Sequence, residues 1–132
     1  MGNYSKDFVS WTIVKMRLEE GVDPPYFYER EIWWASIGHN IGYEEDGKGT
    51  EFGRPIVVLC KFNQHLFWGI PLTTVERHGK YYKYFPYSSE RNSTALLSQL
   101  KAYDSKRLVN KWGVMNELDF EDMKKRIIKI LN

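Results

Sequence analysis

The chain has 132 residues, of which 42% are hydrophobic and 27% charged, so it suits one domain with a core and excludes intrinsic disorder as its main state. Its 19 basic and 17 acidic side chains give a net charge of +2, so any site for nucleic acid must be local. A single cysteine excludes a disulfide framework and CxxC sites, and no apolar run reaches the ~20 residues that span a bilayer. The N-terminus lacks the layout of a signal peptide, so we expect a cytoplasmic protein.

Residues 5–20 are predicted to form a helix that ends at Gly21. Its apolar face recurs at spacings of three and four, at Phe8, Trp11, Val14 and Leu18. Consecutive prolines at residues 24–25 then hold the chain extended. We therefore expect residues 1–29 to be a helical extension with a proline-rich connector, and residues 30–132 to form the main domain.

The middle of the chain, rich in aromatic residues, has the pattern of short strands. The expected strands cover residues 31–36, 55–60, 66–74, 81–85 and 93–102. Five glycines from residue 38 to residue 53 predict a long loop between the first two. Pro71 indicates an edge or a bulge in its strand. Strands at this spacing predict a small barrel or sandwich, and so a mainly β (α+β) protein.

A second helix is expected to follow Asn116, a good N-cap residue, with acidic side chains in its first turn. Its apolar stripe is Phe120, Met123, Ile127 and Ile130. The predicted order is therefore a helix, about five strands and a helix.

The usual cofactor and metal motifs are missing. Residues 47–53 lack the spacing of a phosphate loop and lead into a strand, and residues 44–46 lack the alternation of a calcium loop. The three histidines, His39, His65 and His78, lie too far apart for a metal-ligand motif. We expect no cofactor and no metal.

Three stretches, in this order, resemble one family. They are residues 30–34 with 40–44, residues 53–59 with 69–74, and residues 95–99 with 104–108 followed by the closing helix. Together they are similar to the MazF/PemK (Kid) toxins of bacterial type II toxin–antitoxin systems, over residues 30–131. The resemblance implies a small SH3-like β-barrel of the PemK/CcdB type with a C-terminal helix, commonly a homodimer. It also implies metal-free cleavage of single-stranded RNA, typically messenger RNA, and neutralisation by a cognate antitoxin protein.

Metal-free cleavage can use the 2′-OH of the RNA as the nucleophile, which gives a 2′,3′-cyclic phosphate and a 5′-OH. It needs a base, an acid and fixed donors for the charge that grows on the phosphate. The resemblance assigns Arg54 and Thr73 to the phosphate and Glu44 to the base. Without the resemblance, these are a surface arginine, a strand-forming threonine and a solvated or loop-binding carboxylate.

The acid and the base remain open, because some family members carry an arginine and an aspartate where this chain has Leu96 and Ser98. RNA contacts are predicted from local positive charge, stacking faces and hydroxyls near the same site. The predicted contacts are Lys48, Phe52, Thr74, Arg77 and Lys80, with Lys83, Tyr81, Tyr82 and Trp68 as further possibilities.

Two other functions stay open. The gyrase-directed CcdB toxins share the barrel and bind a protein through the C-terminal helix. A catalytically inactive SH3-like binding module fits the departures at Leu96 and Ser98. Both alternatives predict that RNA stays intact.

Overall fold

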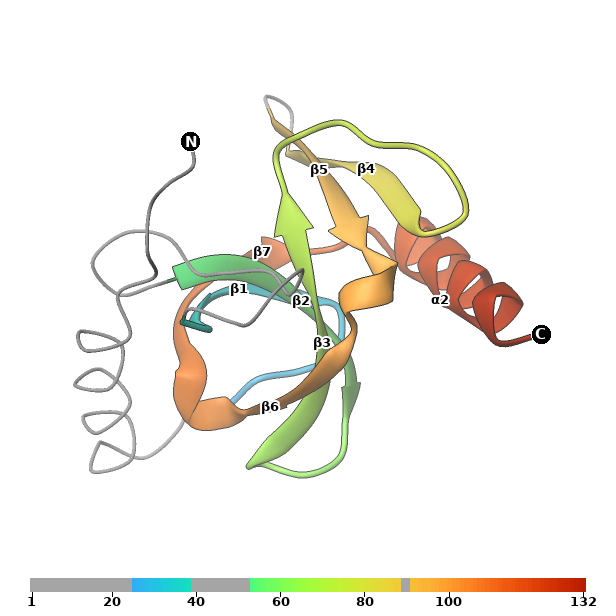
Figure 1. The fold of residues 1–132 in the computed structure, drawn as a ribbon. Helices are drawn as coiled ribbons and strands as arrows, with labels where there is room; N and C mark the ends of the chain where they lie inside the picture. The colour runs from blue at the N-terminus through green and yellow to red at the C-terminus, as the bar shows by residue number, and fades with distance from the viewer. Residues whose placement is uncertain (1–24, 39–52, 89–90) are drawn as a thin grey trace, which may run out of the picture.

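The computed structural model describes residues 25–38, 53–88 and 91–132 (Figure 1). The predicted helix over residues 5–20 and the glycine-rich loop between residues 39 and 52 lie outside them. In the described part, seven antiparallel strands are followed by one α-helix, which confirms a mainly β protein. The elements are β1 (Glu31–Ser36), β2 (Gly53–Lys61), β3 (Leu66–Thr73), β4 (Tyr82–Ser88), β5 (Arg91–Leu96), β6 (Lys101–Asp104), β7 (Leu108–Val114) and α2 (Glu117–Leu131).

The strands form a curled sheet in the order β4-β5-β3-β2-β1-β7, with β6 also paired to β3. Within the described residues no pairing joins β4 to β7, so strand hydrogen bonds do not close the sheet into the expected barrel. Strand β3 pairs with β2 along one side, whereas β6 and β5 share its other side. Pro71 lies where β3 changes partner, between Gly69 facing β6 and Leu72 facing β5. Because a proline has no N–H to donate, it fits at the point where one side of β3 passes from β6 to β5. The edge predicted for this strand therefore exists only at that point.

Two apolar clusters lie on opposite faces of the sheet. One joins the sheet to α2, and it includes Val57, Ile70, Leu72, Phe120 and Met123. The other fills the inside of the curled sheet, and it includes Phe27, Ile56, Val58, Phe67 and Tyr103. Alternate residues of β2 belong to alternate clusters, which is why its apolar run is continuous. Phe27 lies before the domain boundary that we predicted at residue 30, and it is completely buried in the second cluster. That boundary stays a prediction.

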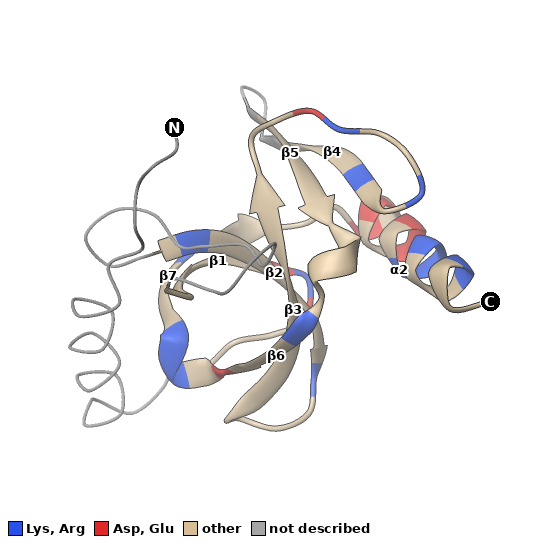
Figure 2. Ribbon diagram, in the orientation of Figure 1, with Lys and Arg blue, Asp and Glu red and all other residues tan. Residues whose placement is uncertain are grey.

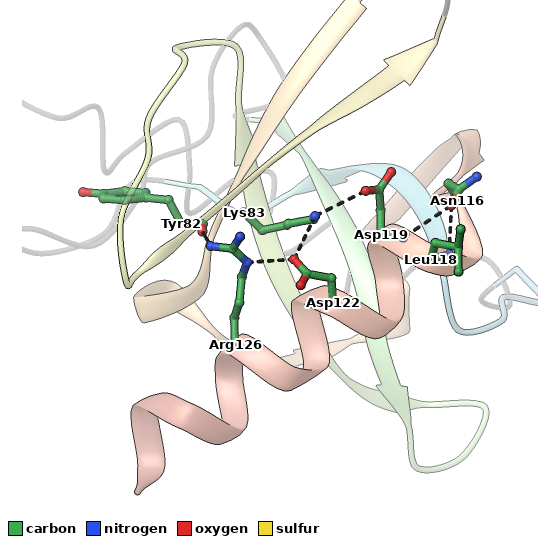
Figure 3. A network of polar contacts seen from close by, with 7 residues as sticks. All are labelled: Tyr82, Lys83, Asn116, Leu118, Asp119, Asp122 and Arg126. Carbon is green, nitrogen blue, oxygen red and sulfur yellow. Dashed lines mark hydrogen bonds and ion pairs between the residues drawn. The ribbon is translucent and has the colours of Figure 1, made fainter.

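The predicted C-terminal helix is confirmed. The side chain of Asn116 accepts hydrogen bonds from the main-chain N–H of Leu118 at 2.8 Å and of Asp119 at 3.3 Å (Figure 3). The helix packs its apolar stripe on the sheet through Phe120 and Met123, and Ile127 is partly buried against the same cluster. This position leaves the opposite end of the sheet uncovered by α2 (Figure 1).

The predicted strand over residues 93–102 is wrong, because β5 ends at Leu96 and β6 begins at Lys101. Between them a 3₁₀ turn (Leu97–Gln99) closes when Leu100 N–H bonds the carbonyl of Leu97, 3.4 Å away. Both β5 and β6 pair with β3, and only β5 also pairs with β4, so the chain keeps β3 as a partner across this turn. Strand β7 was not predicted, because only Leu108 is buried along it and no alternation marks it.

Candidate functional site

Arg54 lies near the start of β2, beside the end of β3. The register pairs Ile56 with Pro71, and continuing it by two residues sets Arg54 opposite Thr73. The Arg54 side chain is largely buried, with the residue 8% exposed, and its Nη1 donates a hydrogen bond to the carbonyl of Leu72 at 3.1 Å. The structure therefore brings together the two residues that the sequence assigned to the phosphate.

Thr73 is half-buried and ends β3. Its Oγ1 accepts a hydrogen bond from the N–H of Val75, 3.3 Å away, so the hydroxyl has a fixed position and its own hydrogen to donate. Across the sheet, Thr73 pairs with the fully buried Thr94. Thr94 Oγ1 donates to the carbonyl of Val75 at 2.9 Å and accepts from the N–H of Arg77 at 3.3 Å. One buried hydroxyl thus ties down the loop that follows Thr73.

A pocket of about 260 Å³ opens at this end of the sheet. Its lining residues come from β2, β3, β5 and β7 and from the residue after β3: Pro55, Leu72, Thr73, Thr74, Asn92, Ser93 and Trp112. Arg54 lies next to this wall, because it precedes Pro55 in the chain and bonds the carbonyl of Leu72. A guanidinium and a hydroxyl side by side are donors suited to phosphate oxygens, and low exposure strengthens their electrostatic attraction.

The other predicted contacts are distributed over two regions. Thr74 lines the pocket, and the main chain of Arg77 is anchored on Thr94 nearby. Lys80 instead lies beside α2, in a second pocket of about 480 Å³ that it shares with Lys125, Arg126 and Lys129. The β3–β4 loop carries its positive charges from the end of β3 across to α2 (Figure 2). Lys80 is therefore not brought together with Thr73 in one pocket.

Lys83 is held in an ion-pair network on the α2 side of the molecule (Figure 3). Its Nζ lies 2.8 Å from an oxygen of Asp122 and 3.3 Å from one of Asp119, and its side chain is only 11% exposed. A lysine that is buried in this way joins β4 to the helix. It is not available as an RNA contact.

Three predicted site residues, Glu44, Lys48 and Phe52, lie outside the described residues. The sequence did not single out Asn92, Ser93 or Trp112, which the structure adds to the pocket. Only the aromatic character of Trp112 marked it, and that signal is shared with four other tryptophans.

A family model described as PemK-like, MazF-like toxin of type II toxin-antitoxin system matches residues 28–131. The chain belongs to this family. No curated protein sequence matches the chain. The solved structures that are similar to it include other toxins at low sequence identity, so they add support for the fold alone.

The structure of MazF (Form-I) from Deinococcus radiodurans is 14% identical, with a TM-score of 0.65 over 81% of this chain and 98% of that chain. MazE-MazF (Form-II) from the same organism is 14% identical, with a TM-score of 0.64 over 82% and 98%. An endoribonuclease in complex with its cognate antitoxin from Mycobacterial species is 10% identical, with a TM-score of 0.61 over 80% and 95%. The fold of the MazF-like toxins therefore extends over most of this chain.

Within the described ranges of this MazF-like toxin, no group of three or more His, Cys, Asp or Glu side chains could hold a metal ion. None of the described helices is long and apolar enough to cross a membrane. Leu96 is buried and Ser98 exposed, so the arginine–aspartate pair of some family members has no replacement at these positions.

Proposed function

We propose that this MazF-like toxin is an endoribonuclease that cleaves single-stranded RNA, typically messenger RNA, without a metal ion. One observation carries the proposal: the guanidinium of Arg54 bonds the residue before Thr73, and Thr73 lines a pocket at the surface. Membership of the toxin family supports the same activity.

In the proposed reaction the 2′-oxygen of the RNA attacks the adjacent phosphorus, and its proton passes to a base. The bond from phosphorus to the 5′-oxygen breaks, and an acid supplies the proton to that oxygen. The products are a 2′,3′-cyclic phosphate and a 5′-OH. Arg54 and Thr73 stabilise the negative charge that grows on the phosphate oxygens. We keep Glu44 as the proposed base, and DNA is no substrate because it lacks the 2′-OH.

The proposal includes a partner, an assembly and a location. The neighbours described as MazE-MazF and as an endoribonuclease with its cognate antitoxin support a cognate antitoxin for this chain. We propose a homodimer in the cytoplasm, with an SH3-like barrel as the protomer. Lys48, Phe52, Thr74, Arg77 and Lys80 remain the proposed RNA contacts of that protomer.

The test is incubation of the purified protein with a long single-stranded RNA in the presence of EDTA, followed by mapping of the ends. We expect discrete cuts that carry 2′,3′-cyclic phosphates, and no cuts in DNA of the same sequence. Intact RNA would contradict the proposal. A gyrase supercoiling assay on the same preparation then distinguishes a CcdB-like toxin from an inactive binding module.

A further inference from the structure

Trp112 lies at an irregularity in the pairing of β1 with β7. Trp33 pairs with Lys111 and Ile32 pairs with Gly113, so the register passes over Trp112. An extra residue of this kind is a β-bulge, which turns its side chain away from the regular alternation of the strand. Bulges are frequent beside functional sites, where they redirect a side chain. Here the redirected side chain is an indole that lines the pocket next to Thr73.

A second tryptophan supports the Trp112 ring. The indoles of Trp34 and Trp112 stack with their centroids 5.2 Å apart and their planes at 17°. Trp34 in turn lies against the main chain of Gly53, where a Cβ atom would overlap its ring. The strand residue that directly precedes Arg54 is therefore a glycine that makes room for the tryptophan pair. Trp34 thus contacts the main chain of the residue next to Arg54.

The rest of the pocket supplies polar groups around this flat surface. Asn92 and Ser93 line it from β5, opposite the end of β3. Burial and Glu76 raise the pKa of the Tyr84 hydroxyl and a hydrogen bond from the Asn92 side chain lowers it, so the Asn92 amide lies within reach of Tyr84. A cavity of about 260 Å³ is smaller than the ~300–1,000 Å³ of sites for drug-sized ligands. One planar aromatic group with polar edges suits this space.

We propose that Trp112, supported by Trp34, is a stacking platform for one unpaired nucleobase of the RNA, directly beside the scissile phosphate, with Asn92 contacting the edge of that base. The inference rests on the proposed function and adds a determinant of sequence preference to it. An exposed indole face supplies affinity for any base, and a fixed amide distinguishes one base from another. Trp112 is 41% exposed, so a base can reach it.

An aromatic side chain of a protein partner is the other occupant of suitable shape. The neighbourhood favours a nucleotide, because the hydroxyls of Thr73, Thr74 and Ser93 line the pocket, and the largely buried guanidinium of Arg54 bonds the carbonyl of Leu72, a residue of its wall. These groups suit a base that is attached to a phosphate. A peptide aromatic group brings no negative charge to Arg54.

The experiment uses the full-length protein and RNA oligonucleotides centred on the mapped cleavage site. They carry 2′-O-methyl groups, so that binding is measured without cleavage. Each nucleotide in turn is replaced by an abasic residue. With the wild type we expect one position next to the cut at which base removal weakens binding roughly 5- to 150-fold, the effect of one lost base–aromatic stack. With Trp112→Ala we expect that position to lose its sensitivity, while the other positions keep theirs.

Trp112→Phe should retain most of the sensitivity, and Trp112→Leu, which keeps apolar bulk without a flat ring, should lose it. This second pair decides the question if the alanine variant does not fold. The matched control is Phe62→Ala, because Phe62 is an aromatic residue that is 48% exposed and packs edge-on against Trp68 outside the pocket. We expect the control to bind and discriminate as the wild type does.

The outcomes separate the two proposals. If the wild type cleaves RNA and Trp112→Ala keeps an unchanged abasic profile, the platform is wrong and the nuclease stands. If Trp112→Ala and Phe62→Ala lose affinity equally at every position, a site-specific stack is also wrong. A wild-type protein that neither binds nor cleaves RNA overturns the nuclease and the platform together.

Discussion

Arg54 donates from Nη1 to the main-chain carbonyl of Leu72, 3.1 Å away, and so ties β2 to the residue that precedes Thr73. A carbonyl within a strand is a rigid acceptor, whereas a side-chain acceptor could move with its rotamers. The bond therefore fixes the guanidinium relative to the Thr73 hydroxyl. Fixed donors need little reorganisation when charge develops on a phosphate, which is the main source of electrostatic catalysis.

Replacing Arg54 with lysine keeps the charge but removes the planar set of donors. We expect the rate of RNA cleavage to fall about 100- to 1,000-fold, as for the loss of one preorganised donor. The measurement is a single-turnover cleavage rate on a short RNA that contains the mapped site.

Stability provides the control for that loss. Arg54→Ala removes a donor from the carbonyl of Leu72, and we expect a cost of about 1–3 kcal/mol in the free energy of unfolding. Arg54→Lys should cost less. An Arg54→Lys protein that cleaves at the wild-type rate would remove this guanidinium from the mechanism.

Thr73 should separate catalysis from folding. Thr73→Val removes the hydroxyl that accepts from Val75 and that we assign to the phosphate, whereas Thr73→Ser keeps it. We expect the valine variant to lose most of its cleavage rate, and the serine variant to retain it within a few-fold. Equal rates for the two variants, at equal thermal stability, would show that the hydroxyl takes no part.

Thr94 is fully buried and pairs with Thr73, which lines the pocket. Its buried hydroxyl holds Val75 and Arg77, so Thr94→Val leaves a main-chain carbonyl and an N–H without their partner. We expect a loss of about 1–3 kcal/mol in unfolding free energy, together with slower cleavage because the loop after Thr73 is released. Thr94→Ser is the matched control. Denaturant unfolding and the cleavage assay should rank the three proteins in the same order.

The sequence predicted the parts of the fold that follow from local patterns. The apolar run of β2 and the Asn116 cap can each be recognised within one short segment of the sequence. It failed at residues 93–102, where a 3₁₀ turn separates two strands without a glycine or proline to mark it. It also missed β7, whose exposed residues follow no alternation because its register with β1 shifts twice.

The candidate site also contains residues that the sequence could predict and residues that it could not. Arg54 and Thr73 could be predicted, because each stands at the end of a recognisable strand and within a resemblance to one family. Trp112 could not, because its position depends on a bulge that the pairing of distant strands creates. Lys83 looked like a possible RNA contact until the packing of β4 on α2 placed it between two carboxylates.

The Lys83 network makes a prediction about acid stability. Hydrogen bonds from Lys83 and Arg126 lower the pKa of Asp122 to about 2, from an ordinary value of 3.8. A carboxyl with a lowered pKa in the folded state stabilises the fold above its unfolded pKa, and this contribution disappears as the pH falls from about 4 to 2. Because the Asp122 side chain is 43% exposed, we expect Asp122→Asn to cost only about 1 kcal/mol at neutral pH.

Direct titration by carbon NMR checks the cause of that shift. Lys83→Met removes the largest contribution, so the pKa of Asp122 should rise towards 3.8 while Arg126 still holds it below that value. An unchanged titration curve in Lys83→Met would contradict the network shown in Figure 3.

The lowered pKa of Glu31 leads to a related prediction for β7, the strand that carries Trp112. Burial raises its pKa, but hydrogen bonds from Lys111, Trp33 and the main chain of Tyr28 outweigh that effect and leave the pKa lowered. Lys111 directly precedes the bulge, and its Nζ lies 2.8 Å from Oε2 of Glu31. This ion pair therefore holds β7 against β1. The stabilisation by this ion pair is therefore present above the ordinary pKa of 4.5 and is lost as the pH falls through the lower pKa of the folded state.

We expect Glu31→Gln to lower the unfolding free energy by about 1–3 kcal/mol at neutral pH, because it removes the ion pair and one charged acceptor. The difference from the wild type should shrink as the pH falls below about 4, where the wild-type carboxyl also becomes neutral. Glu121→Gln is the matched control, because Glu121 is 55% exposed and only 3.5 Å from Lys124 on the helix surface, and it should cost less than about 0.5 kcal/mol. Denaturant unfolding at both pH values measures all three proteins, and a Glu31→Gln deficit that stays constant with pH would show that the carboxylate charge is not what holds β7.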